Sequence, residues 1–536
     1  MTPFLFGVRS VKDGVYPAGK WRPAERCRDE GTVGMELHEV RVYPSKATPA
    51  RKDQLAWKIA EVAADPVAVD RDVAEMVINR IIDDAAVAIA AVNRAPVAHA
   101  RAQALAHPRD GGATVFGLPS GRRFEAEWAG WANNVAVREL DFHDSLMATD
   151  YSHPGDTIPP LVAVAQQCGR SGADLVRAIA AAYEIQVDLV KAIDLHSHRI
   201  DHVAHLGPAV AAGLGALLAL PPEVTYQAVQ QAVHLSFSTR QSRKGEISSW
   251  KAYAPAHTGK VAVEAVDRAM RGEGSPSPIY EGEDSVIAWM LAGKDALYRV
   301  PLPAPGEPKR AILETYPKEH SVAFHIQAVV DLAFKVRERV PDVEQIEAVT
   351  IYTKHHSHRV TGTGSNDPQK MDPRASRETL DHSIMFAFAV ALQDGRWHHI
   401  SSYLPERVGR PDTVSLWQKI KTVEDGEWNR LYDEPDPLHK VHGGRVEILF
   451  RSGERLVDQI LFPNAHPLGA SPFARPDYVA KLERLGEGII SPDECARFID
   501  LVRRLPGLPP QELAGLNLEV DPGGLRCSER DTVGIF

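Results

Sequence analysis

Cysteine is scarce in this chain of 536 residues, which contains only Cys27, Cys168, Cys495 and Cys527. These four residues lie far apart and form no C-x-x-C pair. Their spacing therefore signals neither a disulfide framework nor an iron–sulfur cluster. We expect a reducing, cytoplasmic setting for the protein.

Excess positive charge and long apolar runs are lacking as well. The formal net charge is −10, so we expect no binding to nucleic acid, and any anion site must come from a local cluster of Lys, Arg and His. The longest apolar run, PAVAAGLGALLAL at residues 208–220, is shorter than the roughly 20 residues that cross a bilayer. It predicts a buried helix and no membrane partner.

The patterns that are present change in character along the chain. Residues 1–34 show no sustained periodicity, and we interpret them as a poorly ordered extension. Helical periodicity dominates from about residue 53 to residue 271. The proline-rich segment VPLPAPGEPKR at 300–310 predicts a domain boundary. Beyond it, EQIEAVTIYT and RVEILFRSGERLVDQILF predict strands, the second with a turn at Ser452-Gly453.

The chain end returns to a helical pattern. In SPDECARFIDLVRRL, Ser491 suits the N-cap, Pro492 the first helical position and Glu494 the closing residue of a capping box. The predicted fold is mainly α with a smaller α+β domain. Its predicted parts are a helical domain over 35–305, an α+β domain over 311–465, a return to the helical domain over 466–520, and a tail over 521–536.

A first group of reactive side chains lies in LDFHDSLMATDYSHPGDTIPP, residues 140–160. Asp141 and Ser145 are four apart and would share one face of a helix, and His153 follows in a Pro-Gly turn. A carboxylate, a hydroxyl and an imidazole suit general acid–base chemistry. The alternative is that Ser152 or Asp156 caps a helix and His153 is an ordinary buried side chain.

A second group is the histidine-rich LHSHRIDHVAHLG, residues 195–207. Such density invites a metal site, but there is no H-E-x-x-H pattern and the spacing is irregular. The simpler interpretation is that some of these histidines bond to helix ends and one faces a cavity. The histidines are His196, His198, His202 and His205.

A third group is basic, in STRQSRKGEISSWKAYAPAHTGK. A basic loop that leads into a helix N-terminus suits an anion; a solvated surface loop is the alternative. Its cations, Arg240, Arg243, Lys244, Lys251 and Lys260, face a single acid, Glu246.

Together these motifs resemble the MmgE/PrpD family over nearly the whole chain after Met35. The further motifs that carry the resemblance are GEGSPSPIYEGEDSV and SRETLDHS. The resemblance implies a large helical domain built from both ends of the chain, an α+β domain, a homodimer and no metal or other cofactor. It also implies that water is removed from the tricarboxylate 2-methylcitrate to give 2-methyl-cis-aconitate in propionate breakdown, the methylcitrate cycle.

The resemblance also implies the residues that act. A proton must leave a carbon next to a carboxylate while a hydroxyl departs, which requires a base, an acid and fixed cations. The residues implied as catalytic are Asp141, Ser145, His153, His202 and Lys251. Substrate binding is expected from Arg240, Arg243, Lys244 and Lys318, and Asp141 with His153 is expected to form the acid–base pair.

Three alternatives remain open. One is a lyase similar to cis-aconitate decarboxylase. Another is a family member that binds tricarboxylates without turnover, because Phe386 stands where the family often has a Tyr that could donate a proton. The third is an HD-type metal phosphohydrolase, suggested by His143-Asp144 and the later histidines.

Overall fold

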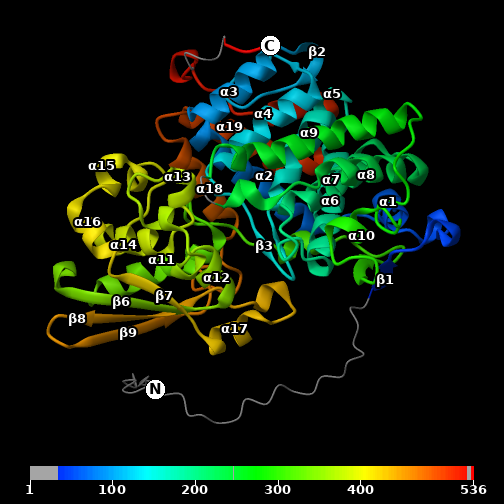
Figure 1. Ribbon diagram of the computed structural model, residues 1–536. Helices are drawn as coiled ribbons and strands as arrows, with labels where there is room; N and C mark the ends of the chain where they lie inside the picture. The colour runs from blue at the N-terminus through cyan, green and yellow to red at the C-terminus, as the bar shows by residue number, and fades with distance from the viewer. Residues whose placement is uncertain (1–33, 245–246, 528–532) are drawn as a thin grey trace, which may run out of the picture.

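The computed structural model describes residues 34–244, 247–527 and 533–536. The extension predicted for residues 1–34 lies outside the described residues, apart from residue 34. The described chain is mainly helical with small sheets. Figure 1 shows a large helical part beside a smaller part that carries the principal sheet.

The helical part is a bundle of long helices around one apolar core. Helices α6 and α7 pack closely, since a Cβ atom on Gly213 would lie 2.9 Å from the Ala182 methyl group. The helices are α1 (Leu55–Ala64), α2 (Arg71–Ala91), α3 (Ala95–Leu105), α4 (Ala126–Glu139), α5 (Ile158–Gln167), α6 (Gly172–Ala192), α7 (Leu206–Leu218), α8 (Pro222–Ser236), α9 (Trp250–Met270) and α10 (Val286–Met290).

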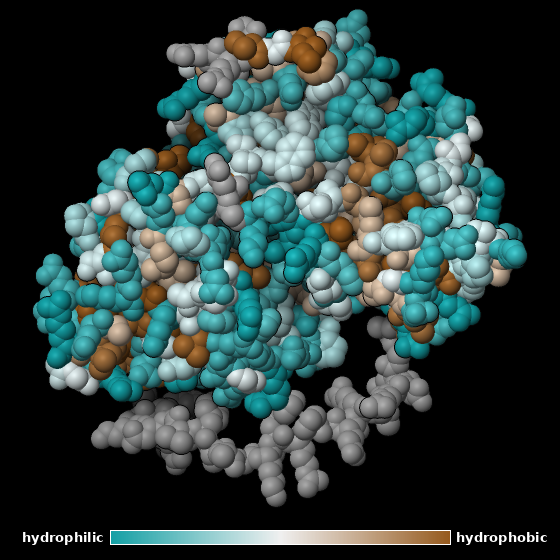
Figure 2. Space-filling view, in the orientation of Figure 1, coloured by the Kyte–Doolittle hydropathy of each residue, from teal (hydrophilic) through white to brown (hydrophobic). Residues whose placement is uncertain are grey.

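The apolar run at 208–220 forms most of α7, as predicted, and every residue of that helix is buried. No helix in the described chain is long and apolar enough to span a membrane. On the face seen in Figure 2, hydrophilic side chains dominate and apolar groups form scattered patches.

The predicted boundary at 300–310 begins later than expected. Residues up to Pro303 belong to strand β5 (Leu297–Pro303), which pairs antiparallel with β1 (Met35–Arg41). Val300 and Leu302 of this strand are fully buried. Proline is tolerated because the pair has only two strands, so one edge of β5 donates no ladder bonds. The shorter strands are β2 (Pro108–Ala113), β3 (Leu146–Met147) and β4 (Tyr151–Ser152).

Helices α18 (Arg475–Gly486) and α19 (Pro492–Arg503) lie against the helical bundle. Tyr478 and Phe498 belong to the same apolar core as α2. Only half of the predicted capping box forms. Ser491 Oγ accepts the Glu494 N–H at 3.1 Å, but the Glu494 carboxylate accepts the Glu519 N–H at 2.8 Å instead of returning to Ser491.

The smaller part contains a four-stranded sheet with the order β7-β6-β8-β9. Strand β6 (Ile346–Thr353) pairs parallel with β7 (Ile420–Glu424) and antiparallel with β8 (Gly444–Phe450), which pairs with β9 (Arg455–Ile460). The strands predicted from EQIEAVTIYT and RVEILFRSGERLVDQILF are confirmed, and Gly453 takes the positive φ of their turn.

Two longer helices, α11 (Phe324–Arg337) and α14 (Ile384–Asp394), pack together in a second apolar core. The shorter helices of this part are α12 (His355–Val360), α13 (Arg377–Leu380), α15 (Pro405–Val408), α16 (Pro411–Trp417) and α17 (Gly426–Tyr432). Because the two apolar cores are separate, the polar residues at the junction of the two parts are free to form a site.

Candidate active site

A narrow cavity at the junction collects most of the predicted residues. A larger hollow of about 620 Å³ lies near the C-terminus, whereas the narrow cavity measures about 50 Å³. The lining of the larger hollow is mainly aromatic and aliphatic, so we take the narrow cavity, with its acid, base and charged side chains, as the candidate active site. The helical part lines this cavity with Arg138, Asp141, Met147, Tyr151, His153, His202, Arg240, Arg243 and Lys251. The α+β part lines it with Ala323, Phe324, His325, His356, Val360, Lys370 and His382.

Asp141 does not share a helix face with Ser145, as the spacing had suggested. Helix α4 ends at Glu139, and Asp141 adopts a left-handed φ of 49°, a conformation that Asp tolerates better than most residues. Ser145 is extended and exchanges two backbone hydrogen bonds of 2.9 Å with Tyr316. The break in the helix turns the Asp141 carboxylate toward the junction.

The Asp141 carboxylate is buried among cations. Lys318 Nζ lies 2.6 Å from Oδ1, and Lys251 Nζ lies 3.1 Å from Oδ2. Burial opposes ionisation, but Lys251, Lys318 and Arg138 outweigh it and hold the pKa of Asp141 well below its usual range. Burial lowers the pKa of Lys318 to about 8. Several cations stabilise the negative charge of Asp141 at once, whereas each cation shares that one carboxylate with the others.

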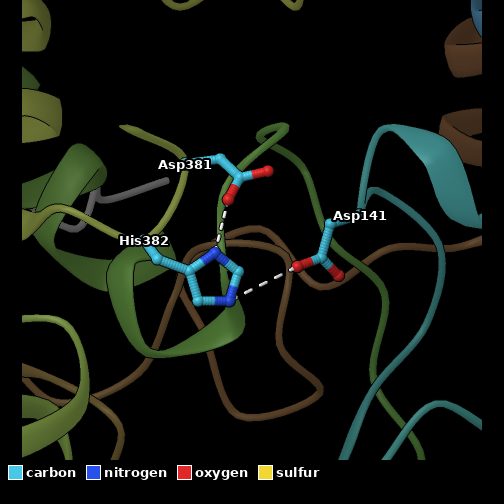
Figure 3. A group of neighbouring side chains, drawn as sticks. All are labelled: Asp141, Asp381 and His382. Carbon is cyan, nitrogen blue, oxygen red and sulfur yellow. Dashed lines mark hydrogen bonds and ion pairs between the residues drawn. The ribbon is translucent and has the colours of Figure 1, made fainter. Parts of the chain in front are cut away.

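Lys251, on the first turn of α9, connects the two parts. Its Nζ lies 3.0 Å from both oxygens of Asp381 and 3.3 Å from His382 Nδ1. Asp141, Asp381 and His382 are close enough to hold a metal ion and form one of two such groups in the described chain (Figure 3). The Lys251 ammonium already contacts all three and supplies the positive charge there.

His153 is oriented by the backbone. Its Nδ1 lies 2.8 Å from the Asp144 carbonyl, which can only accept, so the proton is on Nδ1 and Nε2 carries a lone pair. Nε2 lies 3.9 Å from Asp141 Oδ1. Burial, with Arg138 and Lys318, holds the pKa of His153 well below its usual value. His153 therefore presents an unprotonated nitrogen at neutral pH.

Ser145 lies behind His153, not on the cavity wall. Its Oγ is 3.1 Å from His153 Nδ1, and the residue is fully buried. Neither Ser152 nor Asp156 is the cap that the alternative required: His153 and Thr157 stand at the N-caps of the turn Pro154–Thr157 and of α5 without capping bonds, and the Gly155 N–H is accepted by the Asp144 carboxylate. Ser152 instead accepts a hydrogen bond from Gln186.

The histidine-rich stretch divides as its simpler interpretation predicted. His205 Nε2 bonds the Ile193 carbonyl at the end of α6, at 3.0 Å. His202 lines the cavity, and both of its buried nitrogens lack a hydrogen-bond partner. Burial lowers the pKa of His202 well below its usual value. His202 is thus a neutral group that faces the cavity without a hydrogen-bond partner.

The basic stretch contributes two of its three predicted loop residues to the cavity. Arg243 is held by Asp201, with Nε 3.1 Å from Oδ2. Arg240 donates to the Tyr151 hydroxyl at 3.3 Å, and its Nε is buried without a partner. Lys244 is exposed and lies outside the set of lining residues. Lys318 also lies outside that set, since it is fully buried behind Asp141.

The α+β part supplies histidines that the sequence interpretation missed. His325 and His356 line the cavity with ring centres 4.4 Å apart, and Lys354 lies near them. His325 Nδ1, His356 Nε2 and Lys354 Nζ are buried and lack hydrogen-bond partners. Burial lowers the pKa of Lys354 to about 7. The run KHHSH was a signal, but its pairing with His325 was not visible in the spacing.

Other missed residues stand inside motifs that had been noticed. Tyr151 lies in the first reactive stretch, and Asp381 and His382 lie in SRETLDHS. Arg138 and Lys370 had no such signal, because each stands alone in its local sequence.

Phe386 does not affect the cavity. It is fully buried in α14, with ring centres 5.3 Å from Trp417 and 5.8 Å from Tyr403. The Phe386 ring, and with it the position where a tyrosine would carry its hydroxyl, belongs to the second apolar core. The expectation that Phe386 removes a proton donor from the site is therefore wrong.

His143-Asp144 does not offer a free metal-binding carboxylate. Asp144 Oδ1 accepts the Gly155 N–H and Oδ2 accepts the Tyr183 hydroxyl, both at 2.9 Å. Arg80 Nε lies 3.4 Å from Oδ2. The donors around Asp144 occupy the oxygens that an HD-type site would use.

Several known proteins are similar to this chain. The 2-methylcitrate dehydratase of Cupriavidus necator is 25% identical over 425 residues, 76% of this chain and 81% of that protein. The mitochondrial 2-methylcitrate dehydratase of Yarrowia lipolytica is 25% identical over 348 residues. That match covers 62% of this chain and 64% of the relative, less than two thirds of its length. Alkylcitrate dehydratase phiI of a fungal species is 24% identical over 360 residues, 62% of this chain and 68% of that protein.

The matches to conserved domains follow the two parts of the structure. Residues 53–298 match the MmgE/PrpD N-terminal domain. Residues 320–506 match the MmgE/PrpD C-terminal domain. The chain therefore belongs to the MmgE/PrpD family.

Proposed function

We propose that this protein is a lyase that removes water from 2-methylcitrate to give 2-methyl-cis-aconitate by acid–base catalysis, without a metal ion. The observation that carries the proposal is the charge of the junction cavity. Among its lining residues, five Lys or Arg and five His face one carboxylate, Asp141. A tricarboxylate matches this excess of cationic and hydrogen-bonding groups.

His153 serves as the base. Its Nδ1–H is held by the Asp144 carbonyl, so the lone pair on Nε2 is available to take a proton from the substrate. Arg240 and Lys370 bind carboxylates of the substrate, and Lys251 stabilises the charge that develops next to the carbon losing its proton. The apolar lining residues Met147, Phe324 and Val360 accommodate the methyl group.

A substrate panel tests the proposal. Chelator-treated protein is incubated with 2-methylcitrate, citrate and cis-aconitate, and the products are identified by mass. We expect the unsaturated acid and water from 2-methylcitrate, with no gas released. Carbon dioxide from cis-aconitate would instead indicate a decarboxylase, and activity that chelator removes and a metal ion restores would overturn the metal-free mechanism.

A matched pair of variants tests the anion site. Arg240→Gln removes a guanidinium whose Nε is buried without a partner in the cavity. A charge-assisted contact is worth about 1.5–3 kcal/mol, so KM should rise about tenfold or more. Lys244→Gln removes an equal charge from the exposed end of the same segment and should leave KM unchanged. Equal effects in the two variants would mean that the net charge of the segment acts, and not a contact of Arg240.

A further inference from the structure

Water loss requires a proton donor for the departing hydroxyl, and Asp141 is unsuited to that task. Lys251 and Lys318 keep its carboxyl group ionised, with a pKa well below the usual range. The histidines of the cavity are unsuited as well. Burial lowers the pKa of His202, His325 and His356 well below the usual value and that of His382 to about 4, so these four are neutral. The acid must be another group.

The two lysines near Asp141 are poor candidates. Lys318 donates to the carbonyl and the carboxylate of Asp141 and is fully buried behind it. Lys251 is bound by Asp141 and Asp381 together. Giving up its proton would break two buried ion pairs during the reaction, at a cost that opposes catalysis.

Tyr151 is a phenol that lines the same cavity, on strand β4. Its ring centre lies 5.2 Å from that of His202, whose own ring centre lies 5.5 Å from that of His153. The rings of Tyr151 and of the base His153 therefore both contact the ring of His202. A substrate bound beside His202 lies next to both groups.

The hydroxyl of Tyr151 is placed for proton donation. Its oxygen accepts from Arg240 Nη2 at 3.3 Å, and His196 Nδ1 lies 3.3 Å away. Because Arg240 can only donate, the phenol's own proton points either to His196 Nδ1 or to an acceptor in the cavity, and a substrate hydroxyl there competes with His196 for it. The Arg240 charge also stabilises the phenolate that forms once the proton has left.

We propose that Tyr151 is the catalytic acid that protonates the departing hydroxyl, an assignment that rests on the proposed dehydration. His153 Nε2 takes the proton from the carbon next to a carboxylate, and the electron pair of that bond forms the double bond. The carbon–oxygen bond breaks with its pair on oxygen, which takes the Tyr151 proton and leaves as water. A proton then returns from the His153 imidazolium to the phenolate through solvent.

The groups that face Tyr151 are Arg240, His196, His202, His325 and His356, with the carboxyl groups Asp150 and Asp201 at longer range. Burial raises the pKa of Tyr151 above its usual value, against the opposing effect of Arg240. The phenol therefore stays protonated across the neutral range.

The test compares two variants, Tyr151→Phe and Tyr432→Phe. Tyr432 is a nearby tyrosine outside the cavity lining, and its ring centre lies 6.5 Å from that of His356. Tyr151→Phe keeps the ring and removes only the hydroxyl, so kcat should fall about 10²-fold or more, the contribution typical of a general acid. KM should change much less. Tyr432→Phe should retain the wild-type kcat.

A fluorinated tyrosine at position 151 separates catalysis from packing. Fluorine lowers the phenol pKa, so the alkaline limb of kcat should move to lower pH, a shift that a structural role would not produce. An active wild type whose Tyr151→Phe variant keeps its kcat, or an unmoved alkaline limb, overturns the role of Tyr151 alone. A wild type that leaves 2-methylcitrate intact overturns the proposed function and this step with it.

Discussion

Two groups of basic residues at the junction differ in how their charges are paired. In the Asp141 cluster (Arg138, Asp141, Lys251, Lys318 and Asp381), the two lysines contact carboxylates at 2.6–3.1 Å. In the His356 cluster (His325, Lys354, His356 and His442), every member has a buried nitrogen without a hydrogen-bond partner. No carboxylate within the described residues forms an ion pair with Lys354.

The two clusters therefore differ in whether their charges are balanced by protein groups. The Asp141 cluster pairs both of its lysines closely with carboxylates, although Arg138 Nε and Nη1 are buried without a hydrogen-bond partner, so the positions of the lysines are fixed before a substrate binds. The His356 cluster lacks an anion, and burial keeps its members neutral or weakly charged. If the proposed function holds, a bound tricarboxylate supplies the missing charge. His153 lies against the Asp141 cluster, and substitutions should therefore act differently on the two sides.

The largest effect is expected at the base. His153→Gln removes the lone pair on Nε2 while retaining polar contacts, and kcat should fall about 10²–10⁴-fold. Steady-state kinetics measure this loss, and circular dichroism confirms that the variant is folded. A variant with near wild-type kcat would show that the turn after β4 is structural only.

The low pKa of His153 also predicts a pH profile. A base acts only when unprotonated, and burial holds the pKa of this imidazole well below the usual 6.5. In the free enzyme, kcat/KM should therefore stay high as pH falls through 6.5 and decline only at lower pH. A decline centred at or above 6.5 would contradict this assignment.

Removing one lysine from each cluster compares the clusters directly. Lys318→Met leaves Asp141 with one fewer cation in a buried site, and breaking such a pair costs about 3–5 kcal/mol of unfolding free energy. Lys354→Met removes a buried lysine that has no ion-pair partner and should be neutral or stabilising. Urea denaturation measures both. Equal losses would mean that the two clusters are not paired differently.

The same pair gives a pH test. Burial lowers the pKa of Lys354 to about 7 from its usual 10.5, so between these values the unfolded chain binds more protons than the folded one. Stability rises with pH wherever the unfolded state binds more protons. The wild type should gain stability from about pH 7 toward 10.5, and Lys354→Met should lose that part of the gain. An unchanged slope in the variant would contradict this assignment.

Lys251 tests the Asp141 cluster from within. Lys251→Ala removes charge-assisted contacts worth about 1.5–3 kcal/mol, and kcat/KM should fall by the corresponding tenfold to hundredfold. It also leaves Asp141, Asp381 and His382 facing an empty centre (Figure 3), where a divalent cation should now bind. Calorimetry with Zn²⁺ compares the variant with Lys251→Arg, which keeps the charge. Equal zinc binding in both would contradict the role of the ammonium.

Local patterns in the sequence predicted the helices and strands but not the contacts between residues far apart in the chain. Helix α7 and the hairpin β8–β9 follow from apolar periodicity and a turn at Gly453, both readable within a dozen residues. The resemblance supplied Asp141, His153 and Lys251. The Lys251–Asp381 contact joins residues 130 apart, and the Lys318–Asp141 contact joins residues 177 apart. Nothing in local spacing encodes such contacts, which explains why Asp381, His325 and His356 were missed.

The smallest effect is expected at Ser145, which the resemblance places among the catalytic residues. Its Oγ lies 3.1 Å from His153 Nδ1, but the Asp144 carbonyl is closer, at 2.8 Å, and already holds the Nδ1 proton. Ser145→Ala therefore removes a secondary contact worth about 0.5–1.5 kcal/mol. The rate should fall by about tenfold at most, with KM unchanged because the hydroxyl lies behind the cavity wall. A rise in KM without a change in kcat would instead place Ser145 in contact with the substrate. The hydrogen bonding on this side of the cavity would then be completed by the ligand, as we expect for the His356 cluster.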